Sequence, residues 1–443
     1  MMNKLFFSIT AVIFFTCTYA FKTSAAGLPD GFKPCASHTY IDWVNRRHPG
    51  YADAMAEHYA TISNKASQKI SNTDVYDIPV VVHVVYNSQV QNLSDEVIKR
   101  QIDILNRDFT RTNADTVNLR PVFAPLSAND ANVRFHLATT DPQGQATTGI
   151  TRTSTNRTSF ADFTSLLGDL SAIERVKSSA DGGIDPWDTS RYLNIWVCNM
   201  ALPLLGVSIL GYATPPPGLP NWPSGSIGDL TDGVVIQYQC ISDNNPNPLI
   251  VGGDTSLVLG RTVVHEVGHY LGLRHIWGDN DDCLADDGVD DTPLSSNESS
   301  FDCDITRNTC LDLGDLDYPD MIENYMDYSS ESCQNTFTKG QVSIMRTVCS
   351  DYRQNLAQIT NGTRWRTSSQ GFKILPNPSA DGNIRFVGIP STSRFVDVID
   401  ISGKFLGREW LQNTGQISLS HLQPGLYFLQ VDGSVVLSKF LRE

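Results

Sequence analysis

Three histidines in one short segment have the types and spacing needed to bind a metal ion. The segment HEVGHYLGLRH places His265, His269 and His275 at positions i, i+4 and i+10. On a helix, positions i and i+4 share one face, so His265 and His269 can point at the same ion. Glu266 lies beside that face, where it can accept a proton from a water molecule on the metal. Glycine adopts a left-handed backbone readily, so Gly272 is expected to end the helix and turn the chain back towards the ion.

Three imidazoles with an open fourth position are the ligand set of a catalytic zinc ion. Such an ion polarises a carbonyl group and lowers the pKa of a bound water towards about 7, so that Glu266 can act as general base in peptide hydrolysis. The alternative is a chance HExxH match on a surface helix, which the spaced glycine and the third histidine argue against. His83 stands alone in an apolar run and is interpreted as structural.

The start of the chain is typical of a secretory signal peptide. In residues 1–20, Lys4 precedes a short apolar stretch, and Thr18-Tyr19-Ala20 provides a cleavage site with a small residue at its end. The stretch is too short for a comfortable membrane span, so the mature protein is expected to have no transmembrane helix. Lipid attachment at Cys17 is the alternative, although the preceding residues match that signal poorly. The sequence therefore predicts a secreted or cell-surface protein.

Length and charge narrow the class of protein further. The 443 residues are enough for two or three folded units, and the hydrophobic content of 40% is ordinary for globular proteins. The net charge of −15 leaves no basic surplus to neutralise phosphates, which argues against nucleic acid as a partner.

The elements expected to position the histidines form an α+β domain over residues 77–356. Residues 21 to about 72, within the expected pro-segment 21–76, are polar and helix-prone with few core residues. The apolar run 78–86 is typical of a buried strand, and Ser94 can cap a helix whose apolar residues repeat at helical spacing. Further strands are expected at 133–138, 192–198 and 233–239, the histidine helix at 255–271 and another helix at 339–356. This order predicts a sheet with the active-site helix packed beneath it.

The C-terminal part of the chain has a different pattern. Residues 357–371 are polar and Ser/Thr-rich, which indicates a linker. Residues 372–443 contain short strand patterns, such as 395–401 and 425–431, separated by turn signals. This pattern predicts a small all-β sandwich.

Residues beyond the histidines carry a resemblance to a known family. The HExxHxxGxxH string followed by a methionine resembles the metzincins, and Asn324-Tyr-Met-Asp-Tyr328 resembles their Met-turn, in the form found in the pappalysins. The resemblance implies a metzincin fold with a mixed sheet, an active-site helix and a C-terminal subdomain. It also implies that Met326 is a hydrophobic base for the histidines and that Tyr328 hydrogen-bonds the tetrahedral intermediate. The alternative is a core methionine and a surface tyrosine.

An acidic stretch resembles a calcium-binding segment of the same family. Residues 286–293 offer the carboxylate, hydroxyl and carbonyl oxygens that calcium prefers, but not the spacing of an EF-hand. By resemblance, Asp287 and Thr292 match ligand positions. The alternative is a merely solvated acidic loop.

The family resemblance also implies two disulfides in the loop after the histidines. Four cysteines would pair first with third and second with fourth, as Cys283–Cys310 and Cys303–Cys333. Both would clamp a long irregular loop with little core of its own. The others, Cys198, Cys240 and Cys349, have no family partner and are expected to be buried free thiols.

Glu331 is a candidate for substrate selection. It follows Met326 by five residues, and in part of this family an acidic residue here faces the pocket for the side chain after the scissile bond. The resemblance implies a preference for arginine or lysine at that position, called P1′. The alternative is an exposed loop glutamate.

Cys35, in Lys-Pro-Cys-Ala-Ser, resembles the cysteine of the pappalysin pro-segment. A thiolate is a soft ligand that can fill the open position of zinc, and the resemblance implies that Cys35 holds the enzyme latent. Alanine and serine replace the glycine and threonine of the family element, and an ordinary disulfide cysteine is the alternative. Activating cleavage is expected between Ser63 and Asp77, with Lys65 and Lys69 as candidates.

The last seventy or so residues resemble a type IX secretion sorting domain. The resemblance rests on Pro-Asn-Pro-Ser at 376–379, on residues 399–404 and on Pro-Gly-Leu-Tyr-Phe at 424–428. It implies passage across an outer membrane with the type IX machinery as partner; a substrate-binding β-module is the alternative. For the whole chain, the sequence predicts a secreted, calcium-stabilised zinc endopeptidase. The rivals are an inactive binding protein with this fold and a zinc hydrolase acting on non-protein amides.

Overall fold

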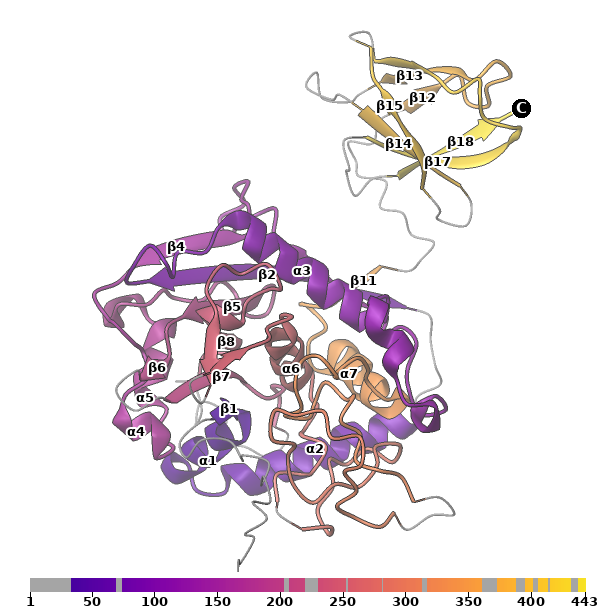
Figure 1. Cartoon of the computed structure of the whole chain (residues 1–443). Coiled ribbons are helices and arrows are strands. Elements are labelled where there is room, and N and C mark those ends of the chain that lie inside the picture. Colours follow the sequence, from indigo (N-terminus) through magenta and orange to yellow (C-terminus); the bar gives the residue numbers. More distant parts are fainter. Residues whose placement is uncertain are drawn as a thin grey trace, which may run out of the picture.

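The computed structural model (Figure 1) describes residues 33–68, 74–202, 207–219, 230–251, 254–280, 282–312, 317–360, 373–387, 395–400, 405–412, 415–431 and 437–443. The predicted signal peptide, with Cys17, lies outside the described residues, and so does Lys69. Over the described ranges, no helix is both long and apolar enough to cross a membrane.

A mixed sheet forms the centre of the larger unit. Its strands are β1 (Lys33–Cys35), β2 (Val75–Tyr86), β3 (Val133–Leu137), β4 (Ile150–Ser154), β5 (Leu193–Cys198), β6 (Ala201–Leu202), β7 (Val207–Ala213), β8 (Val234–Gln237) and β11 (Gln358–Thr360). The main path is β1-β7-β8-β5-β2-β11, with β3 and β4 beside β2 and with β6 beside β7. Strands β2, β5 and β8 are parallel, whereas β7 is antiparallel to β8. β2 is rich in valine and mostly buried, because β-branched side chains pack well in a sheet covered on both faces.

Helices cover both faces of this sheet. They are α1 (Ser37–Arg47), α2 (Tyr51–Gln68), α3 (Asp95–Phe109), α4 (Phe163–Leu166), α5 (Ser171–Glu174), α6 (Arg261–Tyr270) and α7 (Lys339–Asp351). Alternate residues of a strand face opposite sides. Accordingly, Ile195 and Val197 of β5 join the core of α3, α6 and α7, while Trp196 and Cys198 join the core of α1 and α5. The histidine helix α6 thus lies against one face, packed on β7, β8 and α3.

Residues 33–68, called the N-terminal segment below, are built into the larger unit. β1 adds to the sheet in parallel with β7, where Cys35 lies opposite Gly211. The expectation of few core residues here is wrong, because a run of apolar side chains is buried: Ala36, Tyr40, Trp43, Val44, Tyr51, Met55, Ile62 and Ala66. Most of these side chains lie on one face of α1 or of α2, and that face is buried against the rest of the larger unit.

Two predicted helices are shorter than expected. The histidine helix begins at Arg261 rather than near 255, because Gly260 has a left-handed φ of 78° and stops the helix from extending backwards. Residues before it instead form β10 (Asp254–Ser256), antiparallel to β9 (Leu249–Val251). The last helix ends at Asp351 rather than 356. Gly272 has a φ of 94°, as the turn after the histidine helix requires.

Several strands of the larger unit were not predicted, among them β7 and β11. β11 takes Gln358–Thr360, the start of the segment predicted as linker, and pairs antiparallel with the beginning of β2. β7, which pairs with β1 of the N-terminal segment, has no counterpart in the sequence prediction. Its alternating pattern is short and is interrupted by Gly211, so the strand depends on its pairing with β8.

The C-terminal unit is all β. Its strands are β12 (Lys373–Leu375), β13 (Asn383–Val387), β14 (Phe395–Asp400), β15 (Phe405–Trp410), β16 (Gln416–Ser418), β17 (Gly425–Val431) and β18 (Leu437–Arg442). They form a three-stranded sheet, β12-β13-β16, and a four-stranded sheet, β15-β14-β17-β18. Ile384 and Phe386 of the first sheet share a core with Val396 and Leu429 of the second. The predicted β-sandwich is confirmed.

Candidate metal centre

The structure brings the three histidines of the motif to one point. The Nε2 atoms of His265, His269 and His275 lie 3.1 to 3.2 Å from one another. His265 and His269 come from successive turns of α6, and His275 follows the turn at Gly272. Ligands bound to one ion at 2.0–2.1 Å in tetrahedral geometry would be separated by about 3.3 Å. The spacing of the three nitrogens therefore fits a single small cation.

The other nitrogen of each imidazole faces an acceptor. Nδ1 of His265 lies 2.7 Å from the Tyr325 carbonyl oxygen, and Nδ1 of His269 lies 2.9 Å from that of Leu273. Nδ1 of His275 contacts the Asp279 carboxylate. Because each Nδ1 must donate its proton outward, the three Nε2 lone pairs face one another, an arrangement that a cation satisfies.

Burial disfavours the charged form of two of these imidazoles. Burial lowers the pKa of His265 to about 3, assisted by the nearby His275, and burial likewise lowers the pKa of His269. Burial alone would raise the pKa of Asp279. The charge and hydrogen bond of His275, together with His38, outweigh burial and bring the pKa of Asp279 below its ordinary range. Asp279 was missed in the sequence, although its i+4 spacing from His275 is a signal for such a partner.

Glu266 lies beside the histidines and is fully buried. Its Oε2 accepts hydrogen bonds from the Ser37 hydroxyl at 3.0 Å and the Cys35 thiol at 3.4 Å, both of the N-terminal segment. Oε1 has no partner among the described residues. Burial raises the pKa of Glu266 to about 8, against the opposite effect of these two hydrogen bonds. Ser37 was not singled out in the sequence; it also accepts from the backbone N–H of Ala213.

Cys35 completes the cluster. Its Sγ and the ligand nitrogens of the three histidines all lie within 4.8 Å of one another. Three imidazoles and one sulfur form the donor set of a closed, four-coordinate zinc site. Burial, and then the charge of Glu266, raise the pKa of the Cys35 thiol when no cation is present.

The predicted Met-turn lies below the histidines. A Cβ placed on Gly268 of α6 would come within 2.6 Å of the Met326 sulfur, so this position between two histidines admits no side chain. Tyr328 packs against His265 and His275, with ring centroids 5.7 and 4.9 Å away. Its hydroxyl donates to the Cys35 carbonyl oxygen at 3.2 Å. The structure thus places both Met-turn residues next to the cluster.

Glu331 lines a pocket that also touches His265 and Glu266. Its carboxylate meets the first turn of α6, where Oε1 accepts from the backbone N–H and the hydroxyl of Thr262, each at 2.8 Å. Oε2 accepts from the backbone N–H of Leu259. Glu331 is therefore neither a free loop side chain nor a bare charge at the bottom of the pocket.

The acidic stretch contains oxygens without partners. Oδ2 of Asp287, Oδ1 of Asp291 and Oγ1 of Thr292 are buried and have no hydrogen-bond partner among the described residues. Burial raises the pKa of Asp287 well above its ordinary range. The carbonyl oxygen of the neighbouring Gly288 accepts from Ser63 of α2 at 2.6 Å, which ties this stretch to the N-terminal segment.

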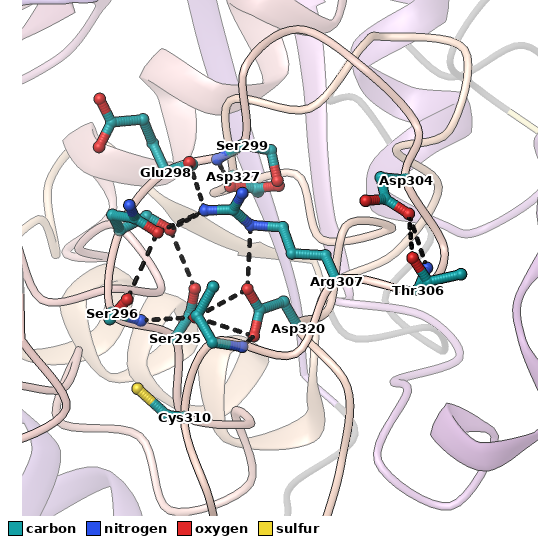
Figure 2. A network of polar contacts seen from close by, with 12 residues as sticks. Ser295, Ser296, Glu298, Ser299, Asp304, Thr306, Arg307, Cys310, Asp320 and Asp327 are labelled. Carbon is teal, nitrogen blue, oxygen red and sulfur yellow. Dashed lines mark hydrogen bonds and ion pairs between the residues drawn. The ribbon is translucent and has the colours of Figure 1, made fainter. Parts of the chain in front are cut away.

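The long loop after the histidines is held covalently and by a polar network. It contains the disulfides Cys283–Cys310 and Cys303–Cys333, the pairs implied by the resemblance. Figure 2 shows Arg307 at the centre of the network. Its guanidinium donates to the Glu298 carbonyl oxygen at 2.8 Å and pairs with Asp320 at 3.0 Å. This anchoring fixes residues 297–302 alongside the Met-turn, where Phe301 N–H donates to the Tyr328 carbonyl oxygen at 3.1 Å.

Other predicted positions lie outside the cluster. His83 is buried in β2, with its ring nitrogens 2.7 Å from Thr151 Oγ1 and 2.9 Å from Asn194 Oδ1, as a structural histidine should be. The remaining cysteines, Cys198, Cys240 and Cys349, are buried and unpaired. Lys65 lies within α2 and its Nζ binds the Tyr352 hydroxyl at 3.0 Å, so it is a poor site for activating cleavage.

Two family models match this chain. Residues 178–350 match the peptidase family described as pregnancy-associated plasma protein-A, and residues 373–439 match a secretion system C-terminal sorting domain. Among curated relatives, an extracellular metalloprotease of Verticillium alfalfae is 31% identical, covering 72% of this chain and 89% of the relative. One of Arthroderma benhamiae is 27% identical, covering 69% of this chain and 83% of the relative.

Solved structures give the same result. Mature mirolysin of Tannerella forsythia in complex with a cleaved peptide is 39% identical to this chain, with a TM-score of 0.52. The match covers 65% of this chain and 100% of the mirolysin chain. A promirolysin mutant of the same organism is 36% identical, with a TM-score of 0.60. This match covers 73% of this chain and 97% of the promirolysin chain. The larger share of this chain covered by promirolysin matches the presence of an N-terminal segment before β2.

Proposed function

Because the chain belongs to the pregnancy-associated plasma protein-A family of metalloendopeptidases, the pappalysins, we propose that it is a secreted zinc endopeptidase made as a latent precursor. The observation that carries this proposal is the convergence of three imidazole nitrogens, 3.1 to 3.2 Å apart, beside a buried glutamate. Four donors of nitrogen and sulfur favour zinc over calcium or magnesium, which prefer oxygen.

In this proposal His265, His269 and His275 hold the zinc ion. When bound, the ion polarises the scissile carbonyl and makes a water molecule more acidic. Glu266 accepts the proton of the attacking water and transfers it to the leaving amine. Its unpartnered Oε1 is available for this role, and Oε2 becomes available once Ser37 and Cys35 leave.

A digest of denatured casein by the mature enzyme tests this function. We expect cleavage that a zinc chelator abolishes and added zinc restores. The same preparation should not cleave a small non-peptide amide. Cleavage of that amide with casein left intact would instead indicate the rival hydrolase. Intact casein after prolonged digestion by zinc-loaded enzyme would support the inactive binding protein.

Tyr328 supplies a hydrogen-bond donor in the reaction. In this structure its hydroxyl binds a backbone carbonyl oxygen of the N-terminal segment, so it can equally donate to a substrate oxygen that gains charge. We predict that Tyr328→Phe lowers kcat roughly 10²-fold, the loss typical of one such donor. KM should change less than about threefold, because the contact strengthens only in the transition state. Steady-state kinetics on a fluorogenic peptide give both values, and a change confined to KM would contradict the role.

Substrate selection is proposed to follow the pocket beside His265. Its acidic character, to which Glu331 contributes, favours a substrate with arginine or lysine at P1′. Mass spectrometry of casein fragments should show basic residues enriched directly after the cut. An even distribution of residues at that position would remove this part of the proposal.

We propose that the acidic stretch binds a structural calcium ion through Asp287 and Thr292. Three buried oxygens without partners, from Asp287, Asp291 and Thr292, are consistent with a hard cation. Calcium at about one hundred times its Kd adds roughly 2.7 kcal/mol to stability. Calcium should therefore raise Tm by roughly 5–10 °C in this chain.

Differential scanning fluorimetry checks the calcium site. Asp287→Asn should abolish the calcium-dependent rise in Tm, whereas Asp304→Asn, at an exposed position of the same long loop, should keep it. An equal rise in wild type and Asp287→Asn would place calcium elsewhere.

The residue ranges of the chain can be assigned to the parts of a secreted precursor. We propose a signal peptide (1–20), a pro-segment (21–76) that includes the N-terminal segment, a catalytic domain (77–356), a linker (357–371) and a sorting domain (372–443). Activating cleavage is proposed between α2 and β2, because Lys65 is held in the helix. Type IX machinery is proposed to export the protein across the outer membrane.

A further inference from the structure

The N-terminal segment contacts the rest of the larger unit through a buried histidine on α2. This helix lies against α7 (Figure 1), and its buried side chains repeat at helical spacing in one stripe. The stripe consists of Tyr51, Met55, His58, Ile62 and Ala66. His58, at its centre, is the one member whose charge can change at a pH near neutral. The sequence prediction did not single it out.

The surroundings of His58 suit a neutral imidazole. The residue is 0% exposed, and its Nε2 lies 3.2 Å from the Pro217 carbonyl oxygen. A carbonyl oxygen can only accept, so Nε2 carries the proton and donates it. Nδ1 is then the unprotonated nitrogen, and it is buried without a hydrogen-bond partner among the described residues. A second proton would have to be carried there, at the cost of a buried donor that lacks an acceptor.

The charged groups on the α7 side do not offset a positive charge on His58. The Tyr352 ring, directly after α7, meets the imidazole edge-on with centroids 4.9 Å apart. Lys65 of α2 lies beside the same ring, with its Nζ 3.0 Å from the Tyr352 hydroxyl. Asp351 is 3.8 Å from that Nζ and is therefore already paired with a cation. The unpaired charge of a protonated His58 would thus be repelled by Lys65.

The groups on the Pro217 side are also paired or neutral. Asp232 and Arg353 line one cavity with Pro217 and bind each other at 2.6 Å. Tyr51, on the same stripe as His58, stays neutral because burial raises its pKa.

The pKa of His58 follows from these contacts. Burial lowers it below its ordinary value of 6.5, and the charge of Lys65 acts in the same direction. The carbonyl oxygens of Pro217 and Pro216 act against this effect without outweighing it.

We propose that His58 is an acid-sensitive contact, whose protonation weakens the docking of the N-terminal segment on the catalytic domain. This inference rests on the proposed latency and adds a trigger for release that is separate from the Cys35 thiol. In the released segment the imidazole meets water and titrates at about 6.5. Docking is therefore strongest above that pH, and each pH unit below it weakens docking by up to about tenfold, until the docked histidine itself takes up a proton.

Hydrogen–deuterium exchange of the full-length, zinc-loaded precursor measures docking without relying on proteolysis. The Glu266→Gln background prevents self-cleavage during the measurement. The readout is the protection factor of the α2 amides, which is corrected for the intrinsic effect of pH on exchange. From pH 7.5 to pH 5.0, protection should fall at least about tenfold more in the chain with His58 than in His58→Phe. Phenylalanine keeps a buried ring that cannot be protonated, so any fall in that variant comes from other groups.

A matched control and a second variant complete the test. His48→Phe changes a half-buried histidine of the same segment and should keep the full acid effect. His58→Gln can still donate to Pro217 but does not titrate, so it should behave like His58→Phe and replaces it if thermal unfolding shows that phenylalanine does not fit. An equal fall with and without His58, or a fall of less than about tenfold in the chain with His58, would overturn the proposal. Casein digestion by the mature enzyme tests the protease function separately, so the two failures can be told apart.

Discussion

Glu266→Gln is expected to lower kcat of the mature enzyme by roughly 10²–10⁴-fold, the usual contribution of a general base. Glutamine has nearly the same shape but cannot accept the proton of the attacking water. Glu266 is suited to the role because it lies beside the three histidines, and removal of the N-terminal segment frees its Oε2 from Ser37 and Cys35. The fold should tolerate the change, since Oε1 has no partner to lose.

Three measurements separate lost chemistry from lost structure. Initial rates on a fluorogenic peptide give kcat, thermal unfolding gives Tm, and metal analysis gives the zinc content. Tm and zinc content should match the wild type, because the Nδ1 atoms of the three histidines hydrogen-bond Tyr325, Leu273 and Asp279 rather than Glu266. His269→Ala is the useful comparison, because it should lose both zinc and activity. A Glu266→Gln enzyme within tenfold of wild type would require another base.

The metal ligands could be predicted from sequence because their geometry is local. Helical periodicity places His265 and His269 on one face, and the turn at Gly272 returns His275 within a few residues. No long-range pairing is needed for that arrangement. The Met-turn lies some fifty residues further on, and its placement under α6 came from family resemblance rather than from physical reasoning about the chain.

Features made by distant segments could not be predicted in this way. The strand β7 exists through its pairing with β8, and β1 through its pairing with β7. Nothing near Cys35 in sequence indicates that its thiol would lie 3.4 Å from Glu266. Likewise, the engagement of Glu331 by Thr262 depends on two loops meeting at the start of α6.

The error about the N-terminal segment has the same cause. Its composition is polar, and the few apolar residues are spread over two helices. Each helix nevertheless aligns them on one face, and the catalytic unit provides the complementary surface: Tyr40 stacks on Tyr212 with ring centroids 5.7 Å apart. A count of apolar residues therefore underestimates a segment that folds onto another unit rather than around its own core.

Cys35→Ala is expected to raise the initial proteolytic rate of the intact precursor at least about tenfold, which corresponds to a weakening of the latent state by about 1.4 kcal/mol. The sulfur is one of four donors around the proposed zinc position and lies 3.4 Å from Glu266, so its loss would open the site next to the base. Activity should nevertheless stay below that of the mature enzyme. The backbone of β1 still covers the cleft, where the Ala36 N–H donates to the Gly211 carbonyl oxygen at 2.9 Å.

Anchors far from Cys35 explain why the effect should be partial. Trp43 Nε1 donates to Asp169 at 2.9 Å, and Ser63 and Ala66 of α2 are bound to Gly288 and Ser343 of the catalytic unit. Initial rates must be taken before the precursor is cut, with gel electrophoresis as the check. Cys198→Ala, which removes another buried thiol that is not part of the histidine cluster, is the matched control and should stay latent. If both variants remained as latent as wild type, latency would rest on the anchored backbone alone, and the Cys35 thiol would not contribute to it.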